Sequence, residues 1–158
     1  MSRATDVLAR LGTQQASIAV AESLTGGLLI SALVDVPGAS AVVRGGIVAY
    51  QTELKSALLG VDAELLASSG AVDARVAEQM ASGVRTRLGA DWGVATTGVA
   101  GPDPQDGHPV GTVFIGVVCG DVRRTRRHEF GGDRSAIRRQ SVDAALQLLL
   151  ECGRGAPT

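Results

Sequence analysis

The chain is poor in aromatic residues and carries almost no net charge, and these two shortages argue against nucleic-acid binding. Aromatic residues make up 3% of the 158 positions, which is too few to build platforms on which bases stack. The 15 lysine and arginine residues balance 16 acidic residues, and the net charge is −1, so no general attraction to phosphate backbones exists. We interpret the one basic run, over residues 123–128, as an edge strand whose charges oppose aggregation. We therefore expect no nucleic-acid partner.

Cysteine is also scarce, and long apolar runs are missing. Two cysteines, Cys119 and Cys152, are too few for a secreted disulfide scaffold and lack metal-ligand spacing. Asp103, Asp106 and His108 lie in a proline-rich loop, and a solvated turn explains them better than a metal site. No apolar run approaches the roughly 20 residues that cross a bilayer, and no signal-peptide pattern is present. We expect a cytoplasmic protein without membrane contact, metal or cofactor.

Apolar residues and glycine are abundant, at 45% of the chain and 21 residues respectively. This composition favours one folded domain over residues 1–152, followed by a flexible tail over 153–158. Hydrophobic periodicity and turn residues predict the following elements. Strands are expected over 16–21, 44–50, 92–97, 111–119 and 122–130, the last two forming a hairpin. Helices are expected over 3–13 and 27–35, over 52–59, and after the N-caps Asp62, Asp73 and Asp133. This order predicts a three-layer α/β/α sandwich with a mixed, mostly parallel sheet and one hairpin.

Three polar clusters follow predicted strands. They occupy residues 22–27, 50–55 and 96–102, and contain Ser23, Lys55 and a glycine-rich turn respectively. Ligands of α/β sheets bind at the carboxyl ends of the strands. If the three strands are neighbours, the clusters converge on one rim of the sheet, where we expect the chemistry to occur.

Ser23 is a candidate nucleophile, and a serine reacts only when a nearby base removes its proton. His108 lies in the proline-rich loop and His128 on the hairpin, so neither is an obvious partner. A lysine whose pKa is lowered by desolvation can serve instead. Lys55 is the only lysine in a chain whose other basic side chains of high pKa are all arginine. The residues alone leave a second interpretation open, in which Ser23 caps a helix and Lys55 is solvated.

The segments 21–27, 50–55, 97–102 and 131–134 resemble the C-terminal domain of CinA (competence/damage-inducible) proteins, and so do 36–40 and 70–72. The resemblance covers about residues 5 to 150 and includes several ordered motifs at compatible spacings. Leu24 stands where the family frequently has cysteine. We interpret that position as a packing residue, because the thiol has no role in a serine–lysine dyad.

The resemblance implies an amidohydrolase that converts nicotinamide mononucleotide to nicotinic acid mononucleotide and ammonia, a step in NAD recycling. It implies Ser23 as the nucleophile and Lys55 as its base. For this mechanism we expect Tyr50 to tune Lys55 or to contact the substrate. The resemblance also implies the same sandwich fold and self-association as a homodimer or higher homo-oligomer. Two alternatives stay open: a catalytically weak nucleotide-binding or protein-interaction module of the same fold, and an amidase acting on a related amide.

The substrate needs donors for a developing oxyanion and a site for its phosphate. Backbone N–H groups near Gly26 and Gly27, or in the turn 98–101, are candidates for the oxyanion. Helix N-termini and arginine are the usual phosphate ligands, and Arg134 is the predicted anion contact, unless Asp133 only caps its helix and Arg134 is solvated. The predicted substrate-binding residues are Thr25, Gly26, Gly27, Thr97, Gly98, Gly101 and Arg134.

Overall fold

One open sheet runs through the computed structural model, which describes residues 1–153. Its strands are β1 (Ile18–Glu22), β2 (Val43–Val48), β3 (Trp92–Gly98), β4 (Thr112–Cys119) and β5 (Val122–Glu129). The order across the sheet is β2-β1-β3-β4-β5. β1 pairs in parallel with β2 and β3, whereas β4 pairs antiparallel with β3 and β5. Four strands thus share one direction and β4 opposes them, which confirms the mixed, mostly parallel sheet with one hairpin.

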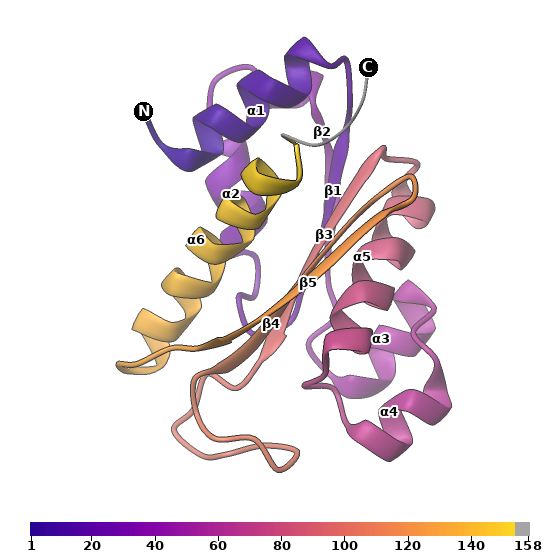
Figure 1. Cartoon of the computed structure of the whole chain (residues 1–158), viewed down its shortest axis with the longest axis vertical. Helices are drawn as coiled ribbons and strands as arrows, with labels where there is room; N and C mark the ends of the chain where they lie inside the picture. Colours follow the sequence, from indigo (N-terminus) through magenta and orange to yellow (C-terminus); the bar gives the residue numbers. More distant parts are fainter. Residues whose placement is uncertain (154–158) are drawn as a thin grey trace.

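Helices cover both faces of this sheet (Figure 1). One layer holds α1 (Arg3–Thr13), α2 (Leu28–Val34) and α6 (Arg134–Cys152), and the other holds α3 (Thr52–Leu59), α4 (Ala63–Ser69) and α5 (Ala74–Leu88). A short 3-10 helix, η1 (Ala39–Ala41), precedes β2. The predicted three-layer sandwich is therefore confirmed. Within residues 1–153, no helix is long and apolar enough to span a membrane. The predicted tail over 153–158 lies, apart from Gly153, outside the described residues.

Aspartate caps begin three of the helices, as the sequence predicts. The carboxylates of Asp62, Asp73 and Asp133 accept hydrogen bonds from the first turns of α4, α5 and α6, at donor–acceptor distances of 2.9, 2.7 and 2.8 Å. Each bond satisfies a backbone N–H that has no partner within its helix. The last cap also fixes where α6 begins, and so where Arg134 lies.

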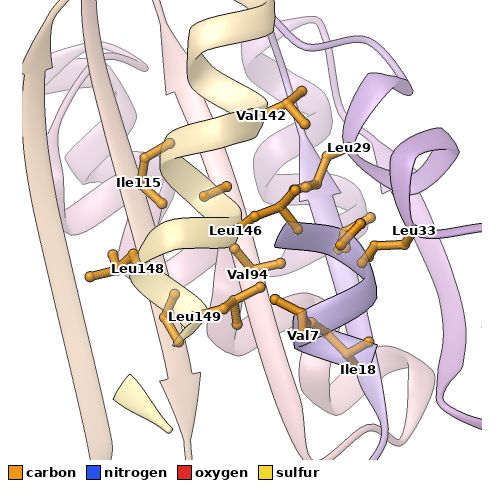
Figure 2. Close-up of a cluster of buried hydrophobic side chains, with 14 of the residues drawn as sticks. Val7, Ile18, Leu29, Leu33, Val94, Ile115, Val142, Leu146, Leu148 and Leu149 are labelled. Carbon is orange, nitrogen blue, oxygen red and sulfur yellow. The ribbon is translucent and has the colours of Figure 1, made fainter. Parts of the chain in front are cut away.

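The core is divided by the sheet because successive strand residues face opposite sides. On β1, Ile18 and Val20 pack into a cluster with side chains of α1, α2 and α6, part of which Figure 2 shows. Ala19 and Ala21 pack into the cluster on the α5 side. The strand that leads into Ser23 is thus fully buried on both faces, which fixes the position of the residue that follows it.

Small residues on the sheet let α5 lie unusually close to β3 and β4. A Cβ atom on Gly93 would lie 2.0 Å from the carbonyl oxygen of Ala81, and one on Gly116 would lie 2.5 Å from that of Ala77. Neither distance is possible for real atoms, so both positions require glycine. The close approach holds the segment before α5 against the end of β3, where the Thr97 hydroxyl donates to the Ala71 carbonyl at 2.8 Å.

The strand β5 forms one edge of the sheet, and its basic run 123–128 is mostly exposed. Three of its four arginines form ion pairs, namely Arg123 with Glu78, Arg126 with Glu151, and Arg127 with Glu129. Charged side chains on an edge strand hinder pairing with another sheet. The run is therefore an edge strand with largely compensated charge.

Candidate active site

The three polar clusters meet at one rim of the sheet because β2, β1 and β3 are neighbours and run in the same direction. The backbone hydrogen bonding continues just beyond the strands. The Ser23 N–H donates to the Thr96 carbonyl at 3.1 Å, and the Ala49 N–H donates to the Glu22 carbonyl at 2.9 Å. Ser23 therefore lies between the ends of the two neighbouring strands.

The amine of Lys55 reaches Ser23 from α3. Lys55 is 1% exposed and shares the buried face of α3 with Leu59. Its Nζ lies 2.9 Å from the Ser23 Oγ, 2.8 Å from the Ala49 carbonyl oxygen and 3.3 Å from the Tyr50 carbonyl oxygen. The structure thus brings the predicted pair into direct contact, and the interpretation of Lys55 as a solvated residue is wrong.

Burial makes this amine a usable base. It lowers the pKa of Lys55 from 10.5 to about 8, while the carboxylates of Asp106 and Glu53 limit the fall by favouring the ammonium. A neutral amine has two N–H groups and one lone pair. The carbonyls of Ala49 and Tyr50 can accept the two N–H groups, which leaves the lone pair to accept the Ser23 hydroxyl proton. This arrangement suits activation of a serine nucleophile.

The first turn of α2 is occupied by the carboxylate of Glu22, which is fully buried at the end of β1. Its Oε1 accepts from the N–H groups of Gly27 and Leu29 at 3.2 and 2.9 Å, and its Oε2 accepts from Ile30 at 3.0 Å. A carboxylate here satisfies the free donors and the positive end of the helix dipole. Ser23 is therefore not the cap of α2, and the alternative interpretation fails on this point too.

The structure corrects the roles predicted for Thr25, Gly26 and Gly27, which do not line the cavity beside Ser23. The Gly26 N–H donates to the Ser23 carbonyl at 3.1 Å, and the Gly27 N–H donates to Glu22. The Thr25 hydroxyl shares a buried hydrogen bond of 2.8 Å with the Thr96 hydroxyl. The N–H groups of both glycines are thus already used, and the Thr25 side chain and the two glycines shape the turn instead of lining the cavity.

A cavity of about 220 Å³ opens onto the serine–lysine pair. From the predicted set it is lined by Ser23, Tyr50, Lys55, Thr97, Gly98, Gly101 and Arg134. Its wall also includes Leu24, the segment 51–52, the segment 71–72 before α5, and residues of the loop 99–105. The segment 70–72 enters the family resemblance only as a connection, and its residue types give no signal that residues 71–72 line the cavity.

Arg134 brings a positive charge to the wall of this cavity. Its guanidinium donates to the Gly101 carbonyl and, at 3.0 Å, to the Tyr50 hydroxyl. Asp133 caps α6, and Arg134 still lines the cavity, so the cap does not remove Arg134 from the site. Tyr50 therefore contacts Lys55 through its backbone carbonyl and Arg134 through its phenol.

Asp106 attaches the loop 103–109 to the segment before α5. Its Oδ2 accepts from the Ala71 N–H at 3.0 Å. A Cβ atom on Gly70, which has φ +73°, would lie 2.6 Å from the Asp106 Cγ, so only glycine admits this contact. Asp106 lies in an exposed turn, as its sequence context predicts, and its bond to Ala71 holds it in place near Lys55. Among the described residues, no three histidine, cysteine or acidic side chains form a metal-binding group.

Comparison with known sequences gives one family. The chain matches the CinA C-terminal domain over residues 1–153. A CinA-like protein of Frankia casuarinae is 55% identical over 151 residues, which are 96% of this chain and 35% of that protein. A CinA-like protein of Mycobacterium marinum is 47% identical over 150 residues, covering 94% of this chain and 35% of that protein. The chain thus spans about a third of the length of these curated relatives.

Comparison with solved structures gives the same family as the comparison of sequences. A competence-damaged protein (CinA) superfamily protein from Klebsiella pneumoniae superposes with a TM-score of 0.94 at 34% identity, covering 98% of this chain and 97% of that one. The competence/damage inducible protein CihA from Agrobacterium tumefaciens gives a TM-score of 0.91 at 35% identity, covering 95% and 93%. These structures have the same fold as this chain over nearly its whole length.

The charge of Asp106 is expected to influence the titration of Lys55. Lys55 is the only lysine among the 158 residues, so selective labelling of lysine gives a single side-chain NMR signal. In the parent protein this signal should titrate at a pH of about 8. Asp106→Asn keeps an oxygen for the Ala71 N–H but removes the charge that favours the ammonium, so the midpoint should fall measurably.

Asp103→Asn is the matched control, because Asp103 lines the same cavity but is not among the carboxylates that raise the pKa of Lys55. Its midpoint should equal that of the parent protein. A Lys55 signal that titrates near 10.5 in the parent would show that the amine is hydrated, contrary to its burial.

Proposed function

Because the chain belongs to the family of CinA C-terminal domains, which includes amidohydrolases, we propose that it hydrolyses nicotinamide mononucleotide to nicotinic acid mononucleotide and ammonia. The observation that carries the proposal is the 2.9 Å contact between the buried Lys55 Nζ and the Ser23 Oγ at the cavity. A module that only binds nucleotides needs neither a nucleophile nor a buried base. The placement of this pair therefore favours an enzyme over a binding module.

In the first half of the reaction, the neutral Lys55 amine takes the Ser23 hydroxyl proton as Oγ bonds to the carboxamide carbon. The electron pair of the C=O bond moves to the oxygen, which becomes an oxyanion. When the carbonyl re-forms, the C–N bond breaks, and the Lys55 ammonium gives its proton to the leaving nitrogen, which departs as ammonia. This leaves an ester between the nicotinoyl group and Ser23.

Lys55 is neutral again once ammonia has left. In the second half, water attacks the ester carbon and gives a proton to this neutral amine. The second tetrahedral intermediate collapses with cleavage of the bond between carbon and the Ser23 Oγ. Lys55 returns the proton to Oγ, and the product leaves as the carboxylic acid, which then loses its proton to bulk solvent. One amide and one water thus give one carboxylic acid and one ammonia, with Lys55 as the only proton carrier. No histidine is required, which agrees with the absence of His108 and His128 from the lining of this cavity.

The shape and charge of the cavity suit the two ends of this substrate. A volume of about 220 Å³ is below the 300–1,000 Å³ that is typical for sites enclosing a whole drug-sized ligand. The cavity therefore encloses the reacting carboxamide and its ring, and the ribose phosphate extends toward the rim. Arg134 is anchored there by the Gly101 carbonyl and Tyr50 hydroxyl, and its guanidinium is suited to a phosphate.

The proposal includes the setting of the reaction. A phosphorylated nucleotide substrate is consistent with a cytoplasmic enzyme, and the family resemblance adds assembly as a homodimer or larger homo-oligomer. The longer relatives contain further sequence, so the proposal concerns only the reaction assigned to the part that this chain covers.

Ammonia release from nicotinamide mononucleotide tests the proposed function. The parent should be active, with kcat/KM rising as the pH increases toward about 8, because the base is the unprotonated amine. Ser23→Ala and Lys55→Met should each lower kcat by at least about 10³-fold. Methionine preserves the buried volume of lysine, so unchanged thermal unfolding would separate lost chemistry from lost folding. A folded parent that releases no ammonia would contradict the proposal.

The phosphate role of Arg134 has its own test. Arg134→Ala should weaken use of the mononucleotide by roughly 10- to 100-fold in kcat/KM, as expected for a charge-assisted contact. Activity on nicotinamide riboside, which lacks the phosphate, should change little. An equal loss on both substrates would assign Arg134 to the shape of the cavity and not to phosphate binding.

A further inference from the structure

The two backbone N–H groups that follow Ser23 have no acceptor within residues 1–153. They belong to Leu24 and Thr25, which are 4% and 0% exposed, and neither N–H donates a hydrogen bond in the described part of the chain. Buried N–H groups without an acceptor are rare because the lost bond to water is costly. Donors placed beside a nucleophile serve to stabilise an oxyanion. These two groups are therefore candidates for that role, in place of Gly26 and Gly27.

Arg138 binds the carbonyl groups of the turn that follows Ser23, whose N–H groups are described above. It lies on α6 four residues after Arg134, so both side chains project from one face of the helix. Its Nε donates to the Leu24 carbonyl at 2.8 Å, and its Nη2 donates to the Thr25 carbonyl at 3.1 Å. The C=O and N–H of a planar trans peptide point in opposite directions. The bond to the Leu24 carbonyl therefore directs the Thr25 N–H away from Arg138.

The shape of the turn makes room for this guanidinium. Gly26 has φ +55°, and a Cβ atom there would lie 3.2 Å from the Arg138 Nη2. Any side chain would thus meet both backbone strain and close contact. On the other side, the buried Glu22 carboxylate binds N–H groups at the start of α2. An anion on the N–H groups and a cation on the carbonyls together fix the turn that carries Ser23.

We propose that Arg138 is a positioning residue, which orients the turn so that the N–H groups of Leu24 and Thr25 donate to the oxygen that becomes negative when Ser23 attacks. Arg138 does not line the cavity, so it acts through the backbone and touches no reacting atom. Its positive charge also polarises the Leu24–Thr25 peptide group, whose carbonyl it binds, and this strengthens the Thr25 N–H as a donor. The inference rests on the proposed function, because it presumes acyl transfer to Ser23.

The test compares Arg138→Met, which removes the charge, with Arg138→Lys, which keeps it but cannot hold two carbonyls as a fork. Arg139→Gln is the control, because Arg139 is exposed and donates to Ser135 instead of to the turn. Three quantities are measured for each variant: kcat and KM for nicotinamide mononucleotide, the rate of p-nitrophenyl acetate hydrolysis, and the NMR titration midpoint of Lys55. The ester passes through the same kind of oxyanion but needs no nucleotide recognition.

Arg138→Met is expected to lower kcat and the ester rate by about 10²-fold, the cost of losing an oxyanion donor, with KM and the Lys55 midpoint unchanged. Added guanidinium ions should restore part of this rate, Arg138→Lys should be intermediate, and Arg139→Gln should match the parent. If Arg138→Met does not fold, Arg138→Lys decides, since its kcat should still fall at constant KM. A guanidinium-independent loss with a shifted Lys55 midpoint would show a structural role and overturn the inference.

A kcat of Arg138→Met within about twofold of the parent value would also overturn the inference about Arg138. That result would favour the turn 98–101 as the source of the oxyanion donors. Failure of the proposed function gives a different result. A parent that hydrolyses the ester through Ser23 but releases no ammonia from the mononucleotide would contradict the substrate alone, and the ester rates would still judge Arg138. A parent that is inert toward both compounds would overturn the inference as well.

Discussion

The hydrogen bond between the Lys55 amine and the Ser23 hydroxyl constrains how the surrounding segments are arranged. An amine that is 1% exposed loses its hydration, and burial without compensation is costly for a charged group. The fold reduces this cost in two ways. The carbonyls after β2 accept its N–H groups, and the lowered pKa makes the neutral form accessible near physiological pH. The desolvation that disfavours the ammonium is thus the same effect that makes Lys55 a base.

The nucleophile and the base are held by different means. Ser23 follows a strand that is buried on both faces, and its turn is fixed by Glu22 on the N–H side and by Arg138 on the carbonyl side. Lys55 comes from α3 on the opposite face of the sheet, where α5 approaches closely over Gly93. Both layers of helices therefore contribute to one contact at the carboxyl end of β1. Rigid elements on both sides are what a preorganised site requires.

Much of this arrangement follows from the sequence, because its signals are local. The caps at Asp62, Asp73 and Asp133, the hairpin, and the three clusters at strand ends were all predictable from residue types and periodicity. Sequence reasoning failed where the deciding contact is distant. The free N–H groups at the start of α2 suggest an anion site, but Glu22 already fills it, and only the structure shows that its carboxylate folds back. The contact between Asp106 and Ala71 spans 35 positions and has no local signal. Arg138 does have a local signal in the sequence, because its spacing of four residues from Arg134 places both arginines on one face of α6.

The central claim is that Ser23, activated by Lys55, forms a covalent ester during hydrolysis. Hydroxylamine tests it most directly when it is added during turnover of nicotinamide mononucleotide and of the corresponding methyl ester. Both substrates pass through one acyl-enzyme in this account, so hydroxamate and acid should form in the same ratio from either compound at each hydroxylamine concentration. Formation of acid alone from the amide, while the ester gives hydroxamate, would mean that water attacks the amide directly and would contradict the claim.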